Sequence, residues 1–133
     1  GLLPLDVDKL SSIAVIGPNA DSQEVLKGNY NGTASEYVTI LEGIHRICDG
    51  KARVFYSEGC PLYRDRSEGL ALPGDRLGEA VAVAREADVV VLCLGLDPRI
   101  EGEEGDASNE YGAGDKAHLN LPGLQQKLLE KVE

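Results

Sequence analysis

No stretch of the 133-residue sequence comes close to the roughly 20 consecutive apolar residues of a membrane-spanning helix. The first five residues, Gly-Leu-Leu-Pro-Leu, lack the basic start of a signal peptide. Positive charge is scarce too, with 13 Lys and Arg against 23 Asp and Glu, a formal net charge of −10 and a pI near 4.6. Because a negative field repels polyanions, we expect no nucleic acid and no membrane as partners, whereas an uncharged ligand is compatible with this charge.

Cysteine and histidine are few and lie far apart in the sequence. Cys48, Cys60 and Cys93 are an odd number of cysteines without C-x-x-C spacing, and Cys93 falls inside an apolar run. His45 and His118 match no zinc-binding motif. We therefore predict buried, unreactive thiols, and we expect neither a metal site nor a cofactor.

Phosphate-binding motifs are missing as well. Residues 17–21 (GPNAD), which follow the first predicted strand, form neither a G-x-G-x-x-G turn nor a P-loop. Arg99 is the basic residue that the loop after the third predicted strand offers to a phosphate. A phospho-acceptor domain would need paired acids after the first strand, where Asp21 stands by itself. The sequence therefore disfavours nucleotide binding and phospho-relay functions.

Short apolar runs alternate with helical patterns along a length that suits one domain or a piece of one. We expect strands at residues 12–17, 52–56 and 89–94, and helices at residues 39–48, 76–87 and 124–132. Residues 89–94 (VVVLCL) are so continuously apolar that they predict the central strand of a parallel sheet. Thr39 is the expected cap of the first helix, and Leu124, Leu128 and Val132 the expected buried face of the last.

This alternation implies parallel strands joined by helical crossovers. The predicted fold class is α/β, with a doubly wound, mostly parallel sheet that carries helices on both faces in three layers. With a strand order of 2-1-3, the chain reverses direction between the first and third strands, where such sheets bind ligands. The two longest connections, residues 18–37 and 96–122, leave from those strand ends. Three strands leave an edge without a partner, so we expect an incomplete sheet.

The loop after residues 89–94 is rich in carboxylates, and crowding them there costs free energy unless something uses them. One interpretation is a solvated, mobile loop, and another is a calcium site, although the D-x-[DN]-x-[DN]-G spacing is absent. A third is acid/base chemistry, which needs a carboxyl whose pKa is raised by neighbouring carboxylates or partial burial. Glu101 lies between an apolar residue, Ile100, and Gly102. The carboxylates of the loop are Asp97, Glu101, Glu103, Glu104, Asp106, Glu110 and Asp115.

Several sequence blocks carry a resemblance, in order, along nearly the whole chain. They are IAVIGPNAD (13–21), GNYNGT (28–33), TILEGI (39–44), YSEGC (56–60), EADVVVLCLGLD (86–97), IEGEEGD (100–106) and LNLPGLQQKLL (119–129). Together they resemble glycoside hydrolase family 3. The chain is similar to the first part of that family's second domain, an α/β sandwich that follows a TIM-like barrel.

The resemblance implies a retaining, exo-acting β-glycosidase, a β-glucosidase or β-xylosidase, with a two-carboxylate mechanism. Residues 1–133 would form part of the C-terminal α/β-sandwich domain and would be inactive alone, because the family's nucleophilic Asp belongs to the catalytic barrel domain, which this chain lacks. The implied partners are a β-linked oligosaccharide or glycoside and that N-terminal barrel domain of the same enzyme. The implied chemistry uses no metal and no cofactor.

The I-E-x-E element of the family matches residues 100–103. On that match Glu101 is the candidate general acid/base, and Glu103 is the runner-up. Many members have Asp-Arg after the acidic element, where this chain has Asp106-Ala107. The alternative hypothesis is a non-catalytic module of the same fold that binds carbohydrate or calcium through the acidic loop.

Overall fold

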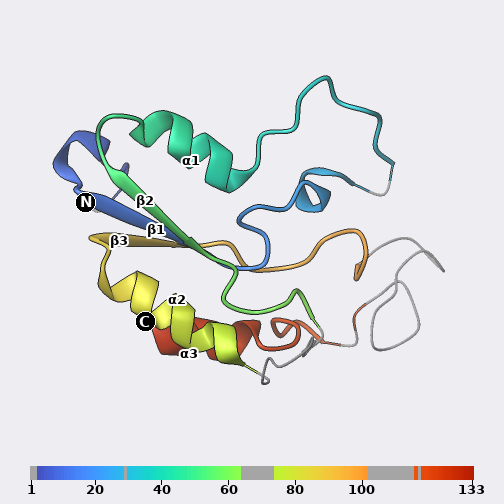
Figure 1. Ribbon diagram of the computed structural model, residues 1–133. Coiled ribbons are helices and arrows are strands. Elements are labelled where there is room, and N and C mark those ends of the chain that lie inside the picture. The colour runs from blue at the N-terminus through green and yellow to red at the C-terminus, as the bar shows by residue number, and fades with distance from the viewer. Residues whose placement is uncertain (1–2, 29, 64–73, 102–115, 117) are drawn as a thin grey trace.

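Three parallel strands form the sheet at the centre of the fold. The structure, a computed structural model, describes residues 3–28, 30–63, 74–101, 116 and 118–133 (Figure 1). β1 (Ser12–Ile16) lies between β2 (Arg53–Ser57) and β3 (Val89–Leu92), and both pairs are parallel. The strand order is therefore 2-1-3, the order that places a reversal of the chain between β1 and β3.

Helices lie on both faces of this sheet. α1 (Ile40–Cys48) covers one face, and α2 (Asp75–Arg85) and α3 (Gln125–Val132) cover the other (Figure 1). Two single 3-10 turns, η1 (Val7–Lys9) and η2 (Glu24–Leu26), precede and follow β1. The predicted α/β class is thus correct. Within the described part of the chain, no helix has both the length and the apolar character that crossing a membrane requires.

β1 is buried along its whole length, and its last three residues have no exposed surface (0%). Ile13 and Val15 pack into the core on the α1 side, whereas Ala14 and Ile16 pack into the core on the side of α2 and α3. Side chains alternate across a strand, so one apolar run supplies both cores. The five-residue apolar segment is therefore the element on which both layers of helices are built.

α1 begins at the predicted threonine. Thr39 Oγ1 accepts a hydrogen bond from the Glu42 N–H at 3.2 Å, and Glu42 Oε2 accepts one from the Thr39 N–H at 2.9 Å. This reciprocal pair is a capping box. Thr39 Oγ1 also donates to Asp21 Oδ1 at 2.9 Å. The start of α1 is thereby tied to the loop that leaves β1.

Among the three described strands β1 lies in the middle, and not residues 89–94 as predicted. β3 pairs with β1 along one edge, and its four residues are each half-buried. The strand ends at Leu92, because the next carbonyl, that of Cys93, accepts a hydrogen bond from the N–H of Asn19 rather than from a strand. A continuous apolar run indicates contact on both faces, but it does not say which strand lies in the middle.

The boundaries of α2 differ slightly from the prediction, whereas the predicted buried face of α3 is confirmed, since Leu128 lies in the core and Leu124 and Val132 pack against it. α2 begins at Asp75 and ends at Arg85, where the sequence predicted residues 76–87. In α3 the fully buried side chains are Gln125 and Leu128, both at 0% exposure, and Leu124 is a half-buried cap residue. Residues three apart share a helix face, so burying Leu128 also buries Gln125.

Gly17 provides a test of the contact between β1 and β3. Its φ is +134°, and a Cβ atom there would lie 2.3 Å from the carbonyl oxygen of Cys93. We predict that Gly17→Ala lowers the free energy of unfolding by about 3 kcal/mol or more, because backbone strain and overpacking add. A Cβ atom added at Gly32 would have no described atom within 4 Å. Gly32→Ala should therefore change the free energy of unfolding by less than about 0.5 kcal/mol. Urea denaturation followed by circular dichroism measures both, and equal midpoints would contradict the prediction.

Candidate active site

The exits of β1 and β3 lie side by side at the carboxyl edge of the sheet. The Asn19 N–H donates to the Cys93 carbonyl at 3.2 Å, and Asn19 Nδ2 donates to the Leu96 carbonyl at 3.4 Å. Asn19 is almost completely buried, with 3% of its surface exposed. The long connections that follow these two strands therefore start at the same edge, as the sequence predicted (Figure 1).

A hydrogen-bonded turn, residues 97–101, follows the exit of β3. Asp97 Oδ1 accepts the Arg99 N–H at 2.8 Å, and the Asp97 carbonyl accepts the N–H groups of Ile100 and Glu101, both at 3.1 Å. Pro98 has no N–H to donate and a restricted φ, which suits the second position of such a turn. The turn is thus closed by the residue with which it begins.

The charge of Asp97 is buried and paired. Its side chain has no exposed surface (0%), and Asp97 Oδ2 accepts hydrogen bonds from Arg99 Nε at 2.8 Å and from Arg99 Nη2. The hydrogen bond with Asp97 is the main reason that the pKa of Arg99 is raised above its ordinary value. A carboxylate buried without a partner would be strongly destabilising. Arg99 therefore stabilises the turn from its solvent side.

Glu101 stands at the end of this turn. Ile100 is 2% exposed and anchors the turn in the protein, whereas Glu101 is half-buried. The Lys116 N–H donates to Glu101 Oε2 at 3.2 Å. Among the described residues, no lysine, arginine or histidine side chain forms an ion pair with Glu101. The predicted apolar neighbour of Glu101 is therefore buried beside it, as the sequence indicated.

Some predicted site residues cannot be compared with the structure. Glu103, Glu104 and Asp106, together with Glu110 and Asp115, lie outside the described residues. The candidate calcium ligands of the acidic loop are Asp97, Glu101, Glu103 and Asp106, and of these Asp97 is already bound by Arg99. Within the described ranges, no group of three or more His, Cys, Asp and Glu side chains could hold a metal ion.

The three cysteines are buried thiols outside any disulfide, and their burial is as predicted. Burial raises the pKa of Cys48 and of Cys93 above the ordinary value, because an apolar environment disfavours the thiolate. A thiol held in its protonated form is a poor nucleophile. These residues therefore belong to the core rather than to a reactive site.

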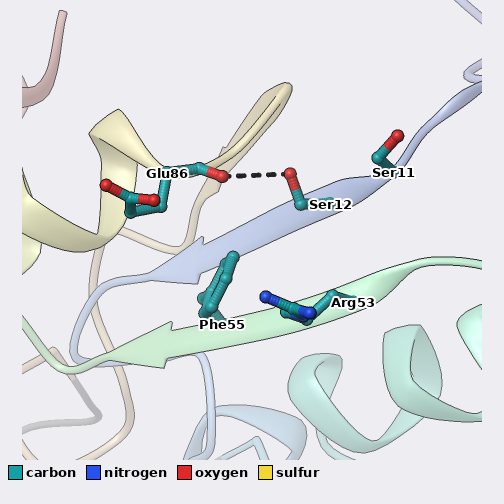
Figure 2. A pocket seen from close by; sticks show the side chains of 5 residues that line it. All are labelled: Ser11, Ser12, Arg53, Phe55 and Glu86. Atoms are coloured by element: carbon teal, nitrogen blue, oxygen red, sulfur yellow. Dashed lines mark hydrogen bonds between the residues drawn. The ribbon is translucent and has the colours of Figure 1, made fainter.

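The opposite edge of the sheet carries a pocket of about 440 Å³ at the amino ends of the strands. Figure 2 shows Ser12 Oγ directed at the backbone carbonyl of Glu86, to which it donates at 3.1 Å, while the Glu86 carboxylate points elsewhere. This hydrogen bond ties β1 to the segment before β3. The residues that line the pocket include a single carboxylate, and they are Ser11, Ser12, Arg53, Phe55 and Glu86. The pocket thus offers no pair of carboxylates, and the candidate site remains the turn at the carboxyl edge.

The fold defines an α/β domain, and the site is a carboxylate held on a turn at the carboxyl edge of its parallel sheet. The chain belongs to glycoside hydrolase family 3, because residues 1–133 match the family's C-terminal domain from end to end. The resemblance of the sequence blocks to this family is therefore confirmed.

The relatives are β-xylosidases and β-glucosidases. Beta-D-xylosidase 1 of Arabidopsis thaliana is 40% identical over 131 residues, covering 98% of this chain and 14% of the relative. A beta-xylosidase of Formosa agariphila is 34% identical over 137 residues, covering 98% and 17%.

Two solved structures are similar to this chain in fold. A β-glucosidase from Erythrobacter marinus has a TM-score of 0.75 at 28% identity, with 98% of this chain and 19% of that chain covered. A family 3 exo-β-xylosidase has a TM-score of 0.74 at 31% identity, with 98% and 14% covered. This chain therefore spans less than a fifth of the length of each of these relatives.

Two features of the site were not predicted from the sequence. The first is the Asp97–Arg99 pair, for which Asp-Pro at residues 97–98 was the available signal, since this dipeptide favours the start of a turn. The second is the buried amide of Gln125, which hydrogen-bonds to Gly95. No local signal marks Gln125, because glutamine is equally common on exposed helix faces.

The role of the Asp97 carboxylate in closing the turn can be tested by proteolysis, because its ion-pair partner, Arg99, is a cleavage site for trypsin. We predict that Asp97→Ala in the full-length enzyme increases the rate of cleavage after Arg99 on the order of tenfold, since opening of the turn would no longer cost the buried hydrogen bonds. Asp49→Ala, at an exposed position after α1, should leave this rate unchanged. Mass spectrometry of limited digests measures both rates. Equal rates in both variants would show that the Asp97 side chain does not close the turn.

Proposed function

We propose that this chain is part of a retaining, exo-acting β-glycosidase that removes terminal β-linked xylose or glucose from oligosaccharides. In this proposal the turn at residues 97–101 supplies the general acid/base, Glu101. The observation that carries it is the setting of Glu101: half-buried, next to the buried Ile100, and without an ion pair among the described residues. The names of the relatives, β-xylosidase and β-glucosidase, support the substrate class.

The proposed role needs a carboxyl that can give and take a proton. In a retaining mechanism one carboxyl group protonates the leaving oxygen, and the same group later removes a proton from the attacking water. The described residues donate one hydrogen bond to the Glu101 carboxylate, from the Lys116 N–H to Oε2. Oε1 is then the oxygen that would face the glycosidic oxygen, while the backbone contact orients the group.

The second carboxylate of the mechanism is proposed to lie outside this chain. Retaining glycosidases hold the two carboxyl groups about 5–5.5 Å apart. Asp97, the nearest described acid in the sequence, is committed to Arg99. We infer that the nucleophile belongs to an N-terminal barrel domain of the same enzyme. The relatives are long enough for such a domain, because this chain covers only 14% and 17% of the two compared.

We also propose that the sheet continues beyond β3. Val89, Val90, Val91 and Leu92 are apolar but each is only half-buried, because β3 pairs with β1 alone among the described strands. An apolar strand with one free edge is prone to pair with another strand. A further parallel strand against this edge would complete a doubly wound, three-layer domain and leave the carboxyl edge open.

The role of Glu101 is tested in the full-length enzyme with Glu101→Gln and two aryl β-xylosides. With a phenyl leaving group, which needs a proton, we predict a loss of about 10²–10⁴-fold in kcat/KM. With a dinitrophenyl leaving group, which departs without one, the loss should be much smaller. Added azide should then raise the turnover of the dinitrophenyl xyloside, because it attacks the glycosyl-enzyme without help from a base.

Glu86→Gln is the matched control, since Glu86 is an exposed carboxylate at the opposite edge of the sheet. It should retain the parent activity on both substrates. Unchanged turnover in Glu101→Gln would exclude Glu101 and transfer the proposed role to Glu103, which the same assay tests as Glu103→Gln.

A further inference from the structure

The side chain of Gln125 makes three hydrogen bonds to the main chain at the candidate site. Its Oε1 accepts the Gly95 N–H at 2.7 Å, and its Nε2 donates to the Gly95 carbonyl at 2.9 Å and to the Leu62 carbonyl at 2.7 Å. Gln125 has no exposed surface (0%). The amide therefore binds the peptide groups of Gly95 as a neighbouring strand would, at the point where β3 has ended.

Asn19 holds the adjacent residues of the same segment. Its N–H donates to the Cys93 carbonyl and its side-chain amide to the Leu96 carbonyl. Asn19 comes from the loop after β1, whereas Gln125 is the first residue of α3. Cys93, Gly95 and Leu96 are thus bound by two buried polar residues from separate elements.

The path from this segment to Glu101 is short and constrained. Asp97 follows Leu96 directly and closes the turn with its own side chain and carbonyl. Ile100, buried at 2% exposure, fixes the far side of the turn. Hydrogen bonds at Leu96 and Asp97 and the burial of Ile100 hold the stretch between Gly95 and Glu101, so we expect a shift of Gly95 to move the Glu101 carboxylate.

We propose that Gln125 is a positioning residue for Glu101. It touches neither the substrate nor the reacting atoms. It sets the position from which the turn at residues 97–101 leaves the sheet. Asn19, in the loop after β1, holds the same segment through Cys93 and Leu96. The inference rests on the proposed acid/base role of Glu101 and adds to it a residue 24 positions later in the chain. A misplaced general acid loses its alignment with the leaving oxygen, and errors near 1 Å can cost about a hundredfold in rate.

The test uses the full-length enzyme carrying Gln125→Met, a substitution of similar length that removes all three hydrogen bonds. The readout is the ratio of kcat/KM for the phenyl xyloside to that for the dinitrophenyl xyloside. This ratio does not depend on how much of the enzyme is folded, so a purely structural role would leave it unchanged. We expect the ratio to fall on the order of tenfold to a hundredfold, because only the phenyl substrate needs the aligned proton.

Gln126→Met is the matched control, because Gln126 is exposed on the same helix and its amide donates to Glu130. It should keep the parent ratio. If Gln125→Met does not fold, Gln125→Glu replaces it, since this variant keeps the acceptor for the Gly95 N–H and loses the amide donors. An unchanged ratio in the folded Gln125 variant would overturn the inference.

Glu101→Gln, measured in parallel, separates this inference from the proposed function. A lower ratio in Glu101→Gln with an unchanged ratio in Gln125→Met would refute only the positioning role. An unchanged ratio in Glu101→Gln would refute the acid/base assignment itself, and the Gln125 proposal with it.

Discussion

The burial of β1 between two parallel neighbours is the constraint on which the other features depend. Four consecutive apolar residues of β1, Ile13, Ala14, Val15 and Ile16, supply side chains to both cores. Because β2 and β3 run parallel to β1, their carboxyl ends meet at one edge. At that edge the Cβ-free Gly17 lets β1 lie against the Cys93 carbonyl. The site is therefore positioned by backbone contacts at the exits of the strands.

Asp97 and Glu101 differ in the partners of their carboxylates. The buried charge of Asp97 is bound by Arg99 and by the backbone of the turn. Among the described residues, the Glu101 carboxylate accepts a hydrogen bond from the Lys116 N–H and forms no ion pair. A general acid must be held in place without being neutralised by a cation, and this difference supports the role proposed for Glu101.

Much of the fold could be predicted because its signals are local. The alternation of apolar runs and helical patterns predicted parallel strands joined by helices, and Thr39 marked the start of α1. Family membership followed from sequence blocks that cover the chain, and the I-E-x-E element singled out Glu101. Among the described strands, the middle position predicted for residues 89–94 belongs to β1, because hydrophobic patterning indicates burial of the two faces of a strand and does not identify its neighbours. Gln125 was missed because its partners, Gly95 and Leu62, are 30 and 63 residues away.

The amino-acid sequence by itself determined the class of fold, the caps and the acidic element that follows β3, since each of these depends on residues within a few positions of one another. Only the tertiary structure showed that the Asp97 side chain is buried against Arg99, and that the buried amide of Gln125 holds the exit of β3. The hydrogen bonds of Gln125 join segments that are 30 and 63 residues apart in the sequence. They require both cores to be packed against β1, because only then are the donors and acceptors within about 3 Å of one another.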